Sequence, residues 1–206
     1  MKAIIFKDWG IRAMLAGKKR MTRMLMKEQP PNDTYFLHQM IDTTNSDKTK
    51  FIGMYKWAIS NVIMHGSEKY FKCPFSMGDV FFAKEAWQDT YQLGDYPGEI
   101  VYRSTYIDDY RGLAPERWIV NWKSPLHLRE QDARIFSQII NIKAEKLQDI
   151  SEEDAQKEGV EFYCEIDGIT HREAFKRCII DIHGPKIWDT NPWVWVYEFE
   201  ENDAKI

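Results

Sequence analysis

The sequence predicts an α+β fold, a mostly antiparallel sheet or small barrel that carries peripheral helices. The segment NPWVWVYEFE (191–200) alternates aromatic side chains with valines, which is the two-residue period of a strand. The segment HREAFKRCIIDIHG (171–184) has helical spacing, and its apolar face holds Phe175, Cys178, Ile179 and Ile182. Strands and helices do not alternate regularly along the chain, as they would in a doubly wound fold.

The N-terminal part predicts a strand, a short helix and a basic segment. KAIIF (2–6) is a short apolar run typical of a strand, and Asp8 fits the N-cap of the helix that follows. Gly17 fits the C′ position that ends this helix. We therefore expect GKKRMTR (17–23) to form a loop or to turn into the next element.

The middle of the chain predicts an insertion and then several strands. Residues 28–72 are expected to pack on the core as an insertion, with a helix over MYKWAISNVIMHG (54–66). VFFAKEAW (80–87) and EIVYRSTY (99–106) predict strands, and a β-branched strand is expected at about 133–144.

A short capped helix is predicted at DISEEDAQKEGV (149–160). Ser151 fits its N-cap, Asp154 its N3 position and Gly159 its C′ position, and acidic residues fill the first turn.

Composition bounds the setting of the protein. No window holds eighteen uninterrupted apolar residues, and the apolar run at the N-terminus is too short for a signal peptide, so neither membrane association nor export is expected. The three cysteines, Cys73, Cys164 and Cys178, are odd in number and have no metal-like spacing. These features favour the reducing cytoplasm over a disulfide framework, and we expect neither a metal nor a cofactor.

Charge is distributed unevenly along the chain, whose net charge is -4. Residues 1–27 contain eight Lys or Arg and one Asp, whereas residues 144–206 contain sixteen Asp or Glu and seven Lys or Arg. A protein that coats nucleic acid non-specifically is usually basic overall. The pattern instead favours a local site for an anionic ligand on an acidic body.

The basic segment contains a candidate nucleophile. It is not a Walker A phosphate loop, because position 12 is Arg where that motif needs Gly, and Lys18 is followed by Lys19. Lys19 and Thr22 are three residues apart and can face one pocket if the chain re-enters a turn. A threonine hydroxyl becomes a nucleophile when a base takes its proton.

A lysine amine can be that base only where burial or nearby cations favour its neutral form. Lys18, Arg20 and Arg23 are the nearby cations, and a carboxylate elsewhere would orient the lysine or carry protons. Spacing alone does not choose that carboxylate. The alternative is that all these side chains are solvated at the end of a helix.

Other side chains are candidates for ligand contact. Glu85, inside an apolar strand, either lines a pocket or faces water at a sheet edge. His127 and Arg129 flank a proline turn and either bind an anion or belong to a surface loop, and Arg134 is expected to pair with an acid. Three tryptophans either stack on a base or pack in the core: Trp87, Trp118 and Trp122.

Five segments resemble the ASCH domain, a family of the PUA-like superfamily, and most closely the longer ASCH-like proteins of phage and prophage genomes. They are LAGKKRMTRM, CPFSMGDVFFAKEAW, WKSPLHLREQDARIF, EKLQDISEEDAQKEGV and NPWVWVYEFE. The resemblance touches both ends and the middle, about half of the chain, and LQDISEEDAQKEGV and NPWVWVYEF are its most specific parts. It implies a single PUA-like β-barrel domain over 1–206, with peripheral helices and insertions at about 28–72 and 88–116.

The resemblance also implies a function. PUA-like folds commonly bind RNA, and one branch of ASCH proteins removes the acetyl group from N4-acetylcytidine. Transferred to this sequence, that chemistry makes Lys19 the base, Thr22 the nucleophile and Glu158 the acid/base or orienting group. The implied ligand-binding residues are Lys18, Arg20, Arg23, Glu85, Trp87 and Arg129.

This chain also departs from the family pattern. Arg20 stands where the family usually has Thr, which is expected to change the size and charge of the pocket. His127 and Leu128 stand where the phage branch often has Met-Pro. Besides a nucleoside amidohydrolase, the alternatives are a non-enzymatic module that binds RNA or a nucleotide, an ASCH-type ribonuclease, and a phage-type module that binds a host protein.

Overall fold

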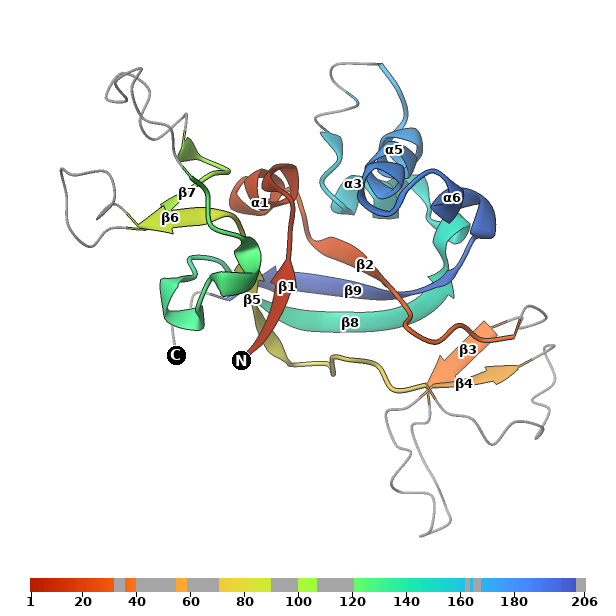
Figure 1. Cartoon of the computed structure of the whole chain (residues 1–206). Coiled ribbons are helices and arrows are strands. Elements are labelled where there is room, and N and C mark those ends of the chain that lie inside the picture. The colour runs from red at the N-terminus through yellow and green to blue at the C-terminus, as the bar shows by residue number, and fades with distance from the viewer. Residues whose placement is uncertain are drawn as a thin grey trace, which may run out of the picture.

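The computed structural model describes residues 1–31, 36–39, 55–58, 71–89, 100–106, 121–161, 164 and 168–202. It is an α+β structure centred on one mixed sheet of five strands (Figure 1). In sheet order these are β1 (Lys2–Ile5), β5 (Val80–Lys84), β8 (Phe136–Lys146), β9 (Trp193–Glu201) and β2 (Met21–Leu25). The β1–β5 pair is parallel and the other three pairs are antiparallel, so the expected fold class is confirmed.

The sheet has two free edges, β1 and β2. Among the described residues no ladder joins these two strands, so backbone hydrogen bonds do not close the sheet into a barrel. The expected closed barrel is therefore not found among these strands. What the structure shows is the coarser arrangement, a mixed sheet with helices beside it.

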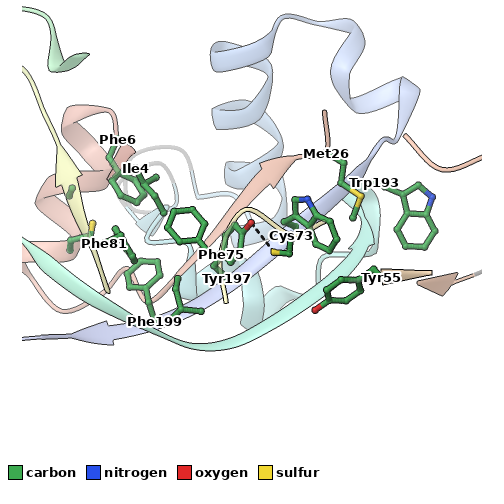
Figure 2. Packing of buried hydrophobic residues seen from close by; sticks show 14 of the residues in the cluster. Ile4, Phe6, Met26, Tyr55, Cys73, Phe75, Phe81, Trp193, Tyr197 and Phe199 are labelled. Atoms are coloured by element: carbon green, nitrogen blue, oxygen red, sulfur yellow. Dashed lines mark hydrogen bonds between the residues drawn. The ribbon is translucent and has the colours of Figure 1, made fainter. Parts of the chain in front are cut away.

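The last strand, β9, lies inside the sheet and is buried on both faces. Its aromatic side chains, Trp193, Trp195, Tyr197 and Phe199, belong to one hydrophobic cluster, and Val194 and Val196 belong to another. The predicted alternation is therefore confirmed. Figure 2 shows the aromatic cluster, where the Tyr197 hydroxyl and the Cys73 thiol lie 3.3 Å apart.

Helices gather over the valine face of β9 (Figure 1). They are α3 (Glu152–Lys157), α5 (His171–His183) and α6 (Lys186–Thr190), whereas α1 (Asp8–Leu15) connects β1 to β2. A capping box at Thr170 and Glu173 starts α5, and the predicted face of Phe175, Cys178 and Ile179 is buried. Ile182, the fourth predicted member of that face, is 40% exposed.

Short elements flank the sheet. Two hairpins pair β3 (Phe36–Gln39) with β4 (Tyr55–Ala58), and β6 (Trp87–Asp89) with β7 (Ile100–Tyr102). Three single 3₁₀ turns are η3 (Pro125–His127), η4 (Glu130–Asp132) and η5 (Leu147–Asp149). No helix in the described ranges is long and apolar enough to cross a membrane.

The predicted helix over 54–66 is wrong for residues 55–58, which form the strand β4, and its remaining residues lie outside the described part. Tyr55 explains the difference, because its ring is buried and meets the Trp195 ring edge-on at 4.6 Å. Tertiary packing of this kind outweighs helical spacing in a short segment. The contact also joins the expected insertion to the core.

The predicted helix ends are largely correct. Gly17 and Gly159 have φ values of 68° and 76°, as C′ residues do, and the Ser151 side chain accepts a hydrogen bond from the Asp154 N–H. Asp8 was expected at the N-cap of α1, but Lys7 occupies that position and Asp8 is the first helical residue. The Asp8 carboxylate instead pairs with Arg103, at 2.7 Å.

Candidate functional site

The end of α1 sets the path of the basic segment. The Gly17 N–H donates to the Met14 carbonyl at 2.9 Å and the Lys18 N–H to the Ala13 carbonyl at 2.8 Å, the two bonds of a Schellman motif. The chain leaves this turn extended, and β2 begins at Met21. Thr22 therefore lies on a strand opposite Tyr197 of β9, so the turn on which a shared pocket with Lys19 was made conditional does not form.

Lys19 is a buried cation held by Glu158. Its Nζ atom donates to Glu158 Oε2 at 2.8 Å, to the Glu158 carbonyl at 2.9 Å and to the Met21 carbonyl at 2.8 Å. These three bonds use every proton of the ammonium group. The rings of Trp9 and Phe6 lie 5.5 and 5.6 Å from Nζ, within reach of a cation–π interaction.

Arg23 joins the same carboxylate to two others. Its guanidinium donates to Glu158 Oε1 at 3.0 Å, to Glu145 Oε1 at 2.6 Å and to Asp154 Oδ2 at 3.0 Å, and its side chain is fully buried. Burial acts to lower the pKa of Arg23, but the Glu158 and Glu145 carboxylates outweigh it and raise that pKa above its ordinary value. Glu158 is therefore shared by two buried cations, Lys19 and Arg23.

Two acids of this network, Glu145 and Asp154, were not predicted as site residues. Asp154 was assigned only to the N3 position of α3, a role that its backbone N–H fulfils while its carboxylate reaches Arg23. Glu145 lies one residue past the β-branched strand that was expected at about 133–144, and it was given no role. A buried guanidinium needs acidic partners, but nothing in the spacing indicated which acids would reach Arg23.

A cavity of about 460 Å³ lies between the two sheet edges, with α5 on one side. Its polar wall is formed by Lys19, Thr22, Arg23 and Glu158, and its apolar wall includes Ile5, Phe175, Ile179 and Ile182. Ile5 and Ile182 are 51% and 40% exposed, so they form an apolar rim. The volume falls within the range of small-molecule pockets.

The Thr22 hydroxyl is an unpaired polar group of this cavity. The residue is 8% exposed, and its hydroxyl makes no hydrogen bond to any residue in the described part of the chain. Because Thr22 lines the cavity, this hydroxyl is available to a ligand. The structure thus brings Lys19, Thr22, Arg23 and Glu158 to one cavity.

The other two cations of the basic segment lie elsewhere. Lys18 forms an ion pair with Glu161, and Arg20 is exposed and donates from Nε to the Gly17 carbonyl at 3.2 Å. Arg20 lines another cavity, of about 260 Å³, which shares Lys19 with the Thr22 cavity, and Arg20 is not among the residues that line the Thr22 cavity. The expected effect of Arg20 on the size and charge of the Thr22 pocket stays a prediction. The four cations of the basic segment do not form one open positive surface.

Glu85 and Arg129 also lie away from the Thr22 cavity. Glu85 is 1% exposed and receives two hydrogen bonds from Arg134, at 2.9 and 3.0 Å, and one from the Ser104 hydroxyl. The expected acid partner of Arg134 is thus Glu85. Arg129 is exposed and pairs with Asp132 at 2.6 Å, within the loop that sequence reasoning offered as an anion site.

Of the candidate tryptophans that the structure describes, Trp87 and Trp122 are not among the residues that line the Thr22 cavity. Trp87 is buried in a small cluster with Phe82 and Leu128. The Trp122 ring meets the Tyr106 ring edge-on at 5.2 Å, and Trp118 lies outside the described residues. Trp9, which was not singled out from the sequence, is the tryptophan that lines the cavity.

The protein is expected to lose stability at low pH through Asp154. Burial acts to raise the pKa of Asp154, but a hydrogen bond from Lys143 at 2.7 Å and the charge of Arg23 lower it below its ordinary value. A carboxyl with a lowered pKa in the folded state stabilises above its unfolded pKa, and that contribution is lost as the pH falls through the folded value. We expect the free energy of unfolding to fall below about pH 4.

Urea unfolding as a function of pH measures this dependence. Asp154→Asn should lower the free energy of unfolding at neutral pH and make it fall less steeply at acid pH. Glu153→Gln changes the exposed neighbouring residue, and its free energy of unfolding should fall at acid pH as steeply as that of wild type. If the free energy of unfolding fell equally steeply at acid pH in wild type and Asp154→Asn, the assigned contribution of Asp154 would be contradicted.

Within the described part of the chain, no three His, Cys, Asp or Glu side chains gather as a metal site. The polar groups that the cavity wall offers a ligand include the Thr22 hydroxyl, the Lys19 ammonium and the Glu158 carboxylate. Comparison of the chain with protein-family models, with curated proteins and with solved structures finds no match.

Proposed function

We propose that the cavity binds a nucleoside-type ligand and that Lys19, Thr22 and Glu158 hydrolyse an acyl amide on it, as the resemblance to ASCH amidohydrolases of N4-acetylcytidine implies. The observation that carries the proposal is the unpaired Thr22 hydroxyl in the same cavity wall as the buried Lys19–Glu158 ion pair. A nucleophile, a proton carrier and a carboxylate are the groups that covalent amide hydrolysis uses. In this proposal the fold is a PUA-like barrel left open between β1 and β2.

The proposed reaction starts from the charged pair. Transfer of one proton from Lys19 to Glu158 Oε2, across 2.8 Å, leaves a neutral amine that takes the proton of the Thr22 hydroxyl. The Thr22 oxygen then bonds to the acyl carbon, the acyl C–N bond breaks, and the leaving amine takes the proton held by Glu158. Water hydrolyses the acyl ester, which releases the acid and restores the Thr22 hydroxyl.

Arg23 is a positioning residue in this scheme. It holds Oε1 of Glu158 while Lys19 holds Oε2, so the carboxylate is fixed from both sides. Charge balance within the site also favours a pocket ligand over a long nucleic-acid strand, because three carboxylates neutralise Arg23 and Lys19 internally. Such cations contribute little to the long-range attraction that binds strands non-specifically.

The proposal is tested with N4-acetylcytidine and a panel of other acyl-nucleosides, with products separated by chromatography. Thr22→Val keeps the shape of the side chain and removes the hydroxyl, so turnover should fall at least about 100-fold while the fold is kept. Thr190→Val, on an exposed threonine that lines neither the Thr22 cavity nor the cavity lined by Arg20, should retain wild-type turnover. No turnover of any substrate by wild type, or equal turnover by Thr22→Val, would overturn the catalytic part.

A non-catalytic binding site is the second candidate, and one observation favours it. All three Lys19 protons are engaged within the protein, as they are in a structural ion pair. In that case wild type and Lys19→Met would bind an acyl-nucleoside without hydrolysing it, and calorimetry with the same panel would detect the binding.

Arg20 is expected to be dispensable for this site. Because its side chain lines the other cavity, Arg20→Thr should leave turnover or binding of the nucleoside within about two-fold of wild type. The same panel of acyl-nucleosides measures the effect. A ten-fold loss of turnover or binding would show that Arg20 contributes to the nucleoside site.

A further inference from the structure

A second cavity adjoins the Thr22 cavity. This groove, of about 690 Å³, runs along α1, and the two cavities share Lys7 and Trp9. The shared residues lie at the start of α1, so a ligand seated beside Thr22 can extend past Trp9 into the groove.

The groove carries positive charge that the protein does not neutralise. Two of its cations are paired, Arg103 with Asp8 and Lys18 with Glu161. Lys7 and Arg12 also line it, are exposed, and form no ion pair with any residue in the described ranges. The groove therefore holds two unpaired positive charges on a chain whose net charge is -4.

The ligand chemistry follows from these two side chains. A phosphate monoester carries close to two negative charges at neutral pH and accepts several hydrogen bonds. Arginine binds such oxygens in a bidentate manner and lysine as a point charge. The Thr22 cavity has an apolar rim at Ile5 and Ile182, whereas the groove beyond Lys7 is cationic.

We propose that the groove is a phosphate subsite, so that the ligand is a nucleotide whose base enters the Thr22 cavity and whose phosphate lies between Lys7 and Arg12. This inference rests on the proposed function, because it assigns the substrate class of the same site. The phosphate belongs either to a free nucleotide or to an RNA strand, and both present the same oxygens to Lys7 and Arg12.

Calorimetry with cytidine, cytidine 5′-monophosphate and a short RNA with one cytidine tests the subsite. Wild type should bind the monophosphate at least about ten-fold more tightly than cytidine, with an advantage that shrinks as salt rises. A Lys7→Ala, Arg12→Ala double variant should lose the advantage. Because Lys7 also lines the Thr22 cavity, the affinity for cytidine is compared in Arg12→Ala, whose position lines the groove and not that cavity. Arg12→Ala should lose part of the advantage and keep the affinity for cytidine. The control Lys27→Ala, Lys186→Ala removes the same charge from exposed positions that line none of the three cavities, and should keep the advantage.

The outcomes separate the two proposals. Cytidine binding without any gain from the phosphate, or an equal loss in both double variants, overturns the subsite alone. Absence of binding by all three ligands overturns the nucleoside site and the subsite together. A further gain for the RNA over the monophosphate, lost in the Lys7 and Arg12 variant, assigns the phosphate to a strand, whereas equal affinities assign it to a free nucleotide.

Discussion

Replacing Glu158 with glutamine is expected to lower the free energy of unfolding by about 3–5 kcal/mol. Glutamine keeps the size and one acceptor of the side chain but removes the charge that Lys19 and Arg23 share. Both cations are buried, at 4% and 7% exposure, so water replaces the lost carboxylate only in part. Urea unfolding at neutral pH measures the loss.

Glu198→Gln is the matched control for this substitution. Glu198 pairs with Lys157 at 2.8 Å, but both side chains are partly exposed, and such pairs contribute about 1 kcal/mol or less. A difference of several kcal/mol between the two variants is the expected result. Equal and small losses would mean that water reaches Lys19 and Arg23, which would contradict a sealed charge network.

Gly159→Ala is expected to destabilise the protein by about 3 kcal/mol and to abolish function at the cavity. The residue has a φ of 76°, and a Cβ there would lie 2.7 Å from the Ala13 Cβ and 2.8 Å from the Lys19 Cβ. The Lys19 Cα would lie only 3.3 Å away, so the backbone that delivers Lys19 to Glu158 must move. Urea unfolding should therefore show a lower free energy of unfolding, and calorimetry should show loss of acyl-nucleoside binding.

Gly17→Ala separates strain from contact. Gly17 has a similar φ, 68°, and also ends a helix, but nothing lies within 4 Å of its added Cβ. Its alanine variant should lose only the strain of a left-handed residue, about 1 kcal/mol. If Gly17→Ala and Gly159→Ala proved equally stable, the close packing of Gly159 on Lys19 would be refuted.

Local signals in the sequence predicted the elements on which the site is built. The alternation in β9 and the glycines that end α1 and α3 depend on neighbouring residues only, and each is found as expected. The segment 55–58 was mispredicted because Tyr55 is placed by Trp195, which is distant in the sequence. Local periodicity carries no information about such a partner.

The candidate site was predictable only in part. Lys19 and Thr22 stood out because a threonine lies among four cations, and the family resemblance suggested Glu158. The acids that neutralise Arg23 were not predictable, since Glu145 and Asp154 come from segments 122 and 131 residues away. A basic segment in the sequence does not show which of its side chains face one cavity, and Arg20 lines a different cavity from the one that Thr22 lines.

The pairing of β2 with β9 has a consequence for how the protein folds. The second strand of the chain pairs with the last described strand, and Lys19 meets Glu158 across 139 residues. Contacts between residues so far apart in the chain slow folding, because the loop between them must close first. During synthesis α1 and the basic segment emerge long before their partners, so Lys19 and Arg23 stay hydrated and their cavity forms only when β9 docks.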